Sequence, residues 1–225
     1  MRPARFDPVQ LSTDESPTGH PFADVRLYHS DLALLNYLLQ DLRVLARRAA
    51  KGELVLTAFE PVLWKVHDLK RRTVVCDPER LLQPANFRMV GFFGDRRDEA
   101  GKLLDETELD VIGEFPSYPG ILSYSSVELV NNQWANLVVH LQSTDREEWR
   151  HSDVHISAAE ELAPQAYHNV RIHNGCIRGG VIGSETVVIE MTKYWDYDTP
   201  DLWHAERVLP GGATGTIGSP WSDLA

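Results

Sequence analysis

The sequence predicts an α+β fold, and three observations lead to that class. The chain has 225 residues, of which 43% are hydrophobic, so it is long and apolar enough to build a core. Leucines from Leu34 to Leu45 recur at helical spacing near the N-terminus. From residue 87 onward, runs rich in β-branched and aromatic residues alternate with helical patterns. We therefore expect one sheet with helices packed against it.

The N-terminal part is expected to contain an arm followed by a helix and strands. Residues 1–22 are rich in Pro, Ser, Thr and Asp and predict a flexible arm. Within segment 23–86, a helix is expected over Ser30–Ala50, with Ser30 or Asp31 as its cap and Lys51-Gly52 closing it. The β-branched and aromatic runs Glu53–Trp64 and Arg72–Cys76 predict two strands.

Residues 87–200 predict a β-α-β-β-α-β order, the arrangement of ferredoxin-like domains. Asn131-Asn132 favours a tight turn between the second and third strands, and Pro164 interrupts the second helix. Glycines in residues 201–225 predict a flexible tail. The expected strands are Phe87–Phe93, Gly120–Leu129, Trp134–Leu141 and Thr186–Tyr194, and the expected helices are Glu99–Phe115 and a second one that begins near Asp145.

A ferredoxin-like unit leaves one face of its sheet uncovered by its own helices. That face has to be buried by a partner or has to enclose a ligand. We expect it to pair with a second copy, or with the N-terminal segment, into an α/β barrel. The sequence thus predicts a homodimer as the leading form of the protein.

The amino-acid composition limits the kinds of partner that the protein is expected to bind. With 22 Lys and Arg against 33 Asp and Glu, the formal charge is −11, which disfavours nucleic acids and anionic membrane surfaces. The apolar runs are much shorter than the roughly 20 residues of a membrane span. Cys76 and Cys176 are the two cysteines, which fits a reducing compartment. We therefore expect a cytoplasmic protein that binds neither nucleic acid nor membrane.

Three segments of the second half carry a family resemblance: Trp149–Val154, Tyr167–Arg171 and Val187–Tyr197. Together they resemble the C-terminal half of dimeric α/β-barrel oxygenases, closest to heme-degrading and antibiotic-biosynthesis-type monooxygenases. The resemblance covers about half of the chain. It implies heme as the cofactor, His168 as the iron ligand and Trp149 as a wall of the pocket.

Other residues compete for these roles. His155 is a second candidate for the heme ligand. The alternative for His168 is a residue without a functional role, partly exposed near a helix end. Arg171 can pair with a heme propionate or a substrate carboxylate, or with a surface glutamate. His151 and His155 are four residues apart, as in helical zinc sites, but the sequence offers no evident third ligand.

Side chains of the predicted strands supply further candidates for catalysis. Because strand side chains alternate, His140 shares its face with Asn136 and Val138 and either lines a pocket or faces outward. Tyr194 can donate a proton to a reacting oxygen, and Asp196 can act as a base. The alternative for these last two is an aromatic belt at an interface.

The leading hypothesis is an oxidoreductase of monooxygenase type that uses heme and acts on a small apolar or aromatic molecule. One alternative is a cofactor-free oxygenase or cyclase in which His140, Tyr194 or Asp196 takes a proton; another is a heme-dependent lyase. A non-catalytic carrier of heme or another hydrophobic ligand, and an assembly module, are the interpretations from other classes. The fold itself does not choose among them.

Overall fold

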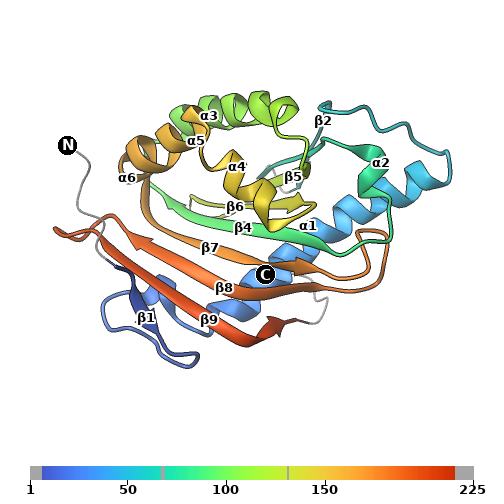
Figure 1. Ribbon diagram of the computed structural model, residues 1–225. Coiled ribbons are helices and arrows are strands. Elements are labelled where there is room, and N and C mark those ends of the chain that lie inside the picture. Colours follow the sequence, from blue (N-terminus) through green and yellow to red (C-terminus); the bar gives the residue numbers. More distant parts are fainter. Residues whose placement is uncertain (1–6, 67–68, 131, 216–225) are drawn as a thin grey trace.

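The computed structural model describes residues 7–66, 69–130 and 132–215. A nine-stranded sheet, in the order β1-β9-β8-β7-β4-β6-β5-β3-β2, runs through the molecule with helices on both faces (Figure 1). No helix in these ranges is long and apolar enough to cross a membrane. The strands are β1 (Val9–Leu11), β2 (Pro61–Val66), β3 (Leu69–Val75), β4 (Phe87–Arg96), β5 (Ile121–Glu128), β6 (Gln133–His140), β7 (Tyr167–Ile177), β8 (Val187–Asp196) and β9 (Trp203–Thr214). The helices are α1 (Leu27–Ala50), α2 (Pro78–Leu81), α3 (Gly101–Glu114), α4 (Ser143–Trp149), α5 (Asp153–Ile156) and α6 (Ala163–Ala166).

The mixed α+β class is confirmed, and the β-α-β-β-α-β unit is present with a different last strand. Strands β7, β4, β6 and β5 are neighbours in that order and pair antiparallel. The unit therefore ends with β7, whereas the sequence analysis ended it with the run that forms β8. The pattern of β7 was misleading because Arg171 and His173, on the face toward α1, are polar where a core strand usually has apolar residues.

The first and last strands of the described chain, β1 and β9, lie side by side at one edge of the sheet. Strand β9 pairs antiparallel with β8 over residues expected to form a flexible tail, and β1 pairs with β9 in parallel. Arg207 of β9 donates hydrogen bonds to the carbonyl oxygens of Ser12 (3.0 Å) and Ala23 (3.0 Å), which holds the N-terminal arm on the sheet. Residues 1–6 and 216–225 lie outside the described residues, as does Asn131 of the predicted turn. Its neighbour Asn132 has the expected positive φ of 61°.

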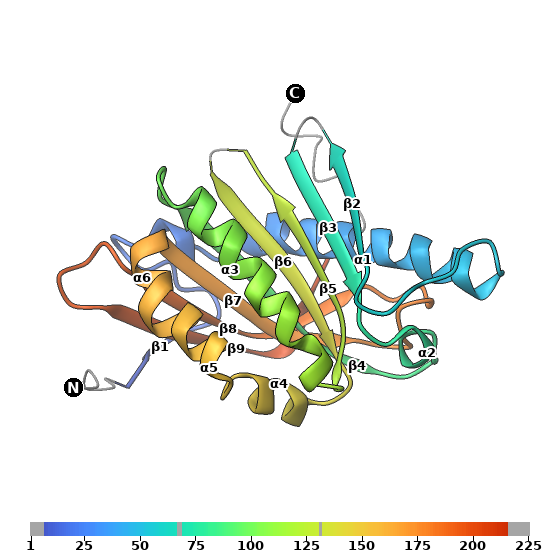
Figure 2. The same cartoon turned by 90° about the horizontal axis from the view of Figure 1, so that it is seen from above.

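Helix α1 covers the sheet face that the ferredoxin-like unit leaves open (Figures 1 and 2). Its leucines, Leu35 and Leu39 among them, are fully buried in one cluster with Met89 and Val139 of the sheet. The helix approaches closely at Gly91, where an added Cβ would lie 2.7 Å from the Leu35 side chain. Each buried leucine contributes roughly 1.5–3 kcal/mol. The sequence allowed either a second copy or the N-terminal segment to bury this face, and the structure has the N-terminal segment there. The homodimer stays a prediction, but the need to bury this face no longer supports it.

Helix α3 and a broken helical segment cover the opposite face. The sequence analysis expected one helix interrupted at Pro164, but the segment consists of α4, a turn, α5, a π-helix over Ser157–Leu162, and α6. π-helical turns are rare in proteins, and those that do occur often lie at functional sites. The π-helix lies between α5 and α6 without a gap, so residues 153–166 form one helical run that changes its hydrogen-bonding register along its length. Helix α4 is separated from this run by the turn at residues 150–152.

Candidate functional site

Three of the predicted site residues meet beneath the broken helical segment. His140 is the last residue of β6, Trp149 ends α4, and His155 lies in α5. The centroid of the Trp149 ring system lies 6.4 Å from that of His140 and 4.6 Å from that of His155. We refer to these three residues as the His140 group.

Local interactions fix the positions of these side chains. The backbone N–H of Gln142 donates to the Asp145 carboxylate at 2.6 Å, which starts α4 directly after β6. Ser152 caps α5 by accepting a hydrogen bond from the His155 N–H at 2.9 Å. The Ser152 hydroxyl also donates to Glu114 of α3 at 2.8 Å. The turn between Trp149 and His155 is thereby tied to its neighbouring helix.

Two members of the His140 group, His140 and Trp149, are buried and have polar side-chain atoms without partners. His140 is 0% exposed, and neither its Nδ1 nor its Nε2 has a hydrogen-bond partner; the same holds for Nε1 of Trp149. Leaving such a group unpaired costs about 1–3 kcal/mol. Buried polar groups are satisfied in the great majority of native structures, so an exception is explained by an ordered water, a bound molecule or a functional role.

Burial also sets the charge of the two imidazoles. Desolvation, with a smaller contribution from the Arg146 charge, lowers the pKa of His140 to about 3. Desolvation and the Arg150 charge lower the pKa of His155 to about 4. Both rings are therefore neutral near pH 7. A neutral imidazole offers one N–H and one lone pair, so His140 and the Trp149 indole together present two donors and one acceptor.

His168 lies elsewhere, on the molecular surface. Its side chain is 40% exposed, and its Nδ1 lies 2.8 Å from the Asp198 carboxylate and 3.2 Å from a guanidinium nitrogen of Arg97. None of these partners belongs to the His140 group. His168 is the second residue of β7 and lies two residues after the end of α6 at Ala166, which is the setting of the non-functional alternative for this residue.

Arg171 and Tyr194 belong to a buried polar network on the α1 side of the sheet. Arg171 donates two hydrogen bonds of 2.6 Å to Asp31 of α1, and its guanidinium lies 4.7 Å from the centre of the Phe93 ring. Tyr194 accepts a hydrogen bond from Arg207. Burial raises the pKa of Tyr194. Both side chains lie on the α1 side of the sheet, and Arg171 pairs with Asp31 instead of the surface glutamate that was one of its expected partners.

The same network contains residues that the sequence analysis did not single out together. Tyr28 donates to the Thr192 hydroxyl at 2.6 Å, Thr192 lies 2.8 Å from Nδ1 of His173, and Nε2 of His173 lies 2.9 Å from Asp31. If Thr192 donates in turn to Nδ1, His173 carries its proton on Nε2 and donates it to Asp31. Each of these groups has a partner, which is typical of a structural network. The sequence signal was weak, since Asp31 was considered only as a helix cap.

Asp196 is the last residue of β8, near the N-terminal arm. Its carboxylate is 2.9 Å from Nδ1 of His20, whose ring stacks on Trp203 at 3.8 Å. These contacts hold the arm on the sheet; the interface alternative for this aromatic stretch stays a prediction.

A heme does not fit this geometry. Among the described residues, the larger of the two best-formed hollows encloses about 110 Å³ and is lined by charged side chains such as Arg96, Asp98 and Asp105. Neither of these two hollows is lined by His155 or His168, the two candidate heme ligands. His168 is held in a surface ion pair, and His155 packs its ring on Trp149. Within the described ranges, no group of three or more His, Cys, Asp or Glu side chains is placed to hold a metal ion.

Comparisons with known proteins found similar solved structures and no similar sequence. No protein-family model and no curated protein sequence matches the chain. Similar solved structures include a protein of Shewanella oneidensis (8% identity, 42% of this chain and 92% of that chain covered, TM-score 0.37). A monooxygenase-like protein of Listeria innocua is 12% identical, with coverage of 53% and 76% and a TM-score of 0.31. An uncharacterized ferredoxin-fold protein from Listeria monocytogenes, described as related to antibiotic biosynthesis monooxygenases, is 13% identical, with coverage of 57% and 86% and a TM-score of 0.32. TM-scores this low carry no argument about residue roles.

Proposed function

We propose that the protein is a monooxygenase-like enzyme that binds a small aromatic or apolar molecule at the His140 group and oxidises it without heme. The observation that supports this most is the set of three unpaired, buried polar atoms on His140 and Trp149. An apolar layer that contains free hydrogen-bonding groups is the usual composition of a small-molecule site. The broken segment from α4 to α6 is the cover that moves when a ligand enters.

The reaction that suits these residues begins with a proton transfer. His140 would accept a proton from an acidic C–H or O–H group of the ligand, while the Trp149 N–H would donate a hydrogen bond to the oxygen on which negative charge develops. Burial makes the free imidazole a weak base. A ligand anion beside it offsets the cost of the imidazolium, so the proton transfer becomes favourable only when the site is filled.

Oxygen would then react with the activated carbon. For a CH2 group flanked by aromatic rings, the overall change is insertion of one oxygen atom to give a carbonyl, and the second oxygen atom leaves as water with the two hydrogens. The electrons come from the substrate itself. No metal, flavin or external reductant is needed for this balance.

Oxygen uptake with anthrone, which contains such a CH2 group, tests the proposal. We expect uptake with the wild type, none with His140→Leu, and uptake near the wild-type rate with His168→Leu, a matched change at a histidine outside the site. Binding is measured separately. The ligand should quench tryptophan fluorescence of the wild type, and this quenching should be lost in Trp149→Phe. Binding without oxygen uptake would support the carrier alternative, and equal uptake by the two histidine variants would refute the role of His140.

A further inference from the structure

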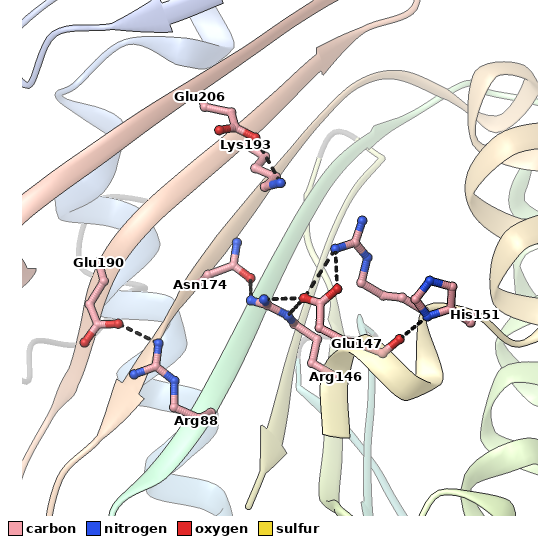
Figure 3. A network of polar contacts seen from close by, with 9 residues as sticks. Arg88, Arg146, Glu147, His151, Asn174, Glu190, Lys193 and Glu206 are labelled. Carbon is pink, nitrogen blue, oxygen red and sulfur yellow. Dashed lines mark hydrogen bonds and ion pairs between the residues drawn. The ribbon is translucent and has the colours of Figure 1, made fainter. Parts of the chain in front are cut away.

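A cluster of cations lies between α4 and the sheet, next to the His140 group. Arg146 donates to Glu147 at 3.0 Å (Figure 3). Arg150 donates to the same carboxylate at 3.2 Å. Burial disfavours the charge on Glu147, yet Arg146, Arg150 and Lys193 together hold its pKa below the ordinary value. Lys193 also pairs with Glu206 at 2.9 Å. Three cations thus share two carboxylates, an excess of positive charge in a chain whose formal charge is −11.

One hydrogen bond of this cluster is made to a neutral acceptor. Arg146 reaches across from α4 and donates to the side-chain oxygen of Asn174 in β7 at 2.5 Å (Figure 3). Hydrogen bonds between a guanidinium and a carboxylate are roughly twice as strong as those between neutral groups, and they can be bidentate. An incoming carboxylate is therefore a better partner for Arg146 than the Asn174 amide. The side chain of Arg146 is 24% exposed, so solvent and small anions can reach it.

Two features couple the cluster to the candidate site: electrostatic interactions with the two histidines, and the position of Arg146 in the same helix as Trp149. The positive charge of Arg146 acts on His140, and that of Arg150 acts on His155. Arg146 also precedes Trp149 by three residues in α4, a spacing that brings side chains to neighbouring positions on a helix. A molecule in contact with Trp149 can therefore place a second group near Arg146.

We infer that the ligand of the His140 group is an acid, with an apolar or aromatic part against Trp149 and a carboxylate bound by Arg146. This inference rests on the proposed function, because it assumes that the His140 group binds a molecule. It assigns to Arg146 the role that the sequence suggested for Arg171. Glu147 and Asn174 share Arg146, which is partly exposed in the last turn of α4, whereas Asp31 holds Arg171 in a buried ion pair. Binding of the carboxylate replaces the Arg146–Asn174 hydrogen bond, so one of the contacts between α4 and β7 opens as the ligand enters.

A pair of probes that differ only in charge tests the inference. Phenylacetate and phenylacetamide have the same ring and nearly the same shape, and calorimetric titration measures the affinity of each. We expect the wild type to bind phenylacetate about tenfold more tightly at low salt, a preference that shrinks as salt is added. Arg146→Gln should abolish the preference and Arg146→Lys should restore part of it. Arg97→Gln is the matched control, since Arg97 pairs with Asp198 away from the His140 group.

The outcomes separate this inference from the proposal on which it rests. Equal affinities for the two probes in the wild type, or a preference that survives in Arg146→Gln, would overturn the role of Arg146 and leave the His140 group as a site for neutral molecules. His140→Leu should weaken both probes alike. If neither probe binds the wild type, the inference and the ligand-binding role of the His140 group both fail.

Discussion

Replacing His140 by leucine is expected to stabilise the protein while removing its proposed activity. The imidazole is fully buried and both of its nitrogens are unpaired, so the folded state carries a desolvation cost without hydrogen bonds to offset it. An apolar side chain of similar size removes that cost, which we put at about 1–3 kcal/mol in favour of the variant near pH 7.

The stabilisation should grow in acid. The pKa of His140 is about 3 in the folded chain against an ordinary value of 6.5, so the unfolded chain takes up a proton first as the pH falls. The free energy of unfolding of the wild type therefore decreases as the pH falls from 6.5 to about 3 because of His140. The leucine variant lacks this titrating group and this decrease. At a pH of about 5 this adds about 2 kcal/mol to the advantage of the variant.

Urea unfolding followed by circular dichroism, at pH values of about 7.5 and 5, measures both effects. His173→Leu is the matched control, because His173 is equally buried but has Asp31 and Thr192 as partners, and its loss should destabilise the chain. A His140→Leu variant that is less stable than the wild type near pH 7.5, or whose advantage does not increase in acid, would refute the reasoning.

Three further predictions concern the network on the α1 side, the surface histidine and the arm. Asp31→Asn should cost about 3–5 kcal/mol, because it leaves the Arg171 cation buried without its carboxylate; thermal unfolding should show a far smaller loss for Asp105→Asn, which breaks an exposed pair. Titration with hemin should give the same absorption spectrum for His168→Ala as for the wild type, and a Soret band that the variant alone lacks would contradict our placement of this residue. Arg207→Met should speed proteolysis of the N-terminal arm, since Arg207 binds its carbonyl groups; unchanged digestion would argue against that anchoring.

Elements with a local pattern were predictable from the sequence. The leucine spacing gave α1 to within a few residues, and the alternation in Trp134–Leu141 placed His140 on the face of Val138, where the structure has it. These predictions succeed because one face of each element is buried against apolar neighbours.

Elements whose buried faces are polar were missed. Strand β7 turns Arg171 and His173 toward α1, so its hydrophobic alternation is hidden. Strand β9 contains Pro210 and adjacent glycines, which are typical of loops. Such strands become recognisable only with their partners, and the Asp31–Arg171 pair joins residues 140 positions apart.

The residues of the candidate site were named from the sequence, but their association was not. His140, Trp149 and His155 entered as separate candidates with different roles. Their proximity depends on how α4 turns back after β6, which the Gln142–Asp145 contact and the cap at Ser152 determine. The unpaired state of His140 is a property of three-dimensional packing and has no signature in the sequence.

The position of α1 has a consequence for synthesis of the chain. A ribosome completes α1 long before it adds β7, β8 and β9, which supply the partners of Asp31 and Tyr28. Until then the leucine face of the helix has only part of its final surface to pack against. Because the covering layer belongs to the same molecule, its docking does not depend on protein concentration. A nascent chain interrupted before Arg207 would lack the hydrogen bond from Arg207 to Ala23. Such a chain would present apolar surface to chaperones and proteases.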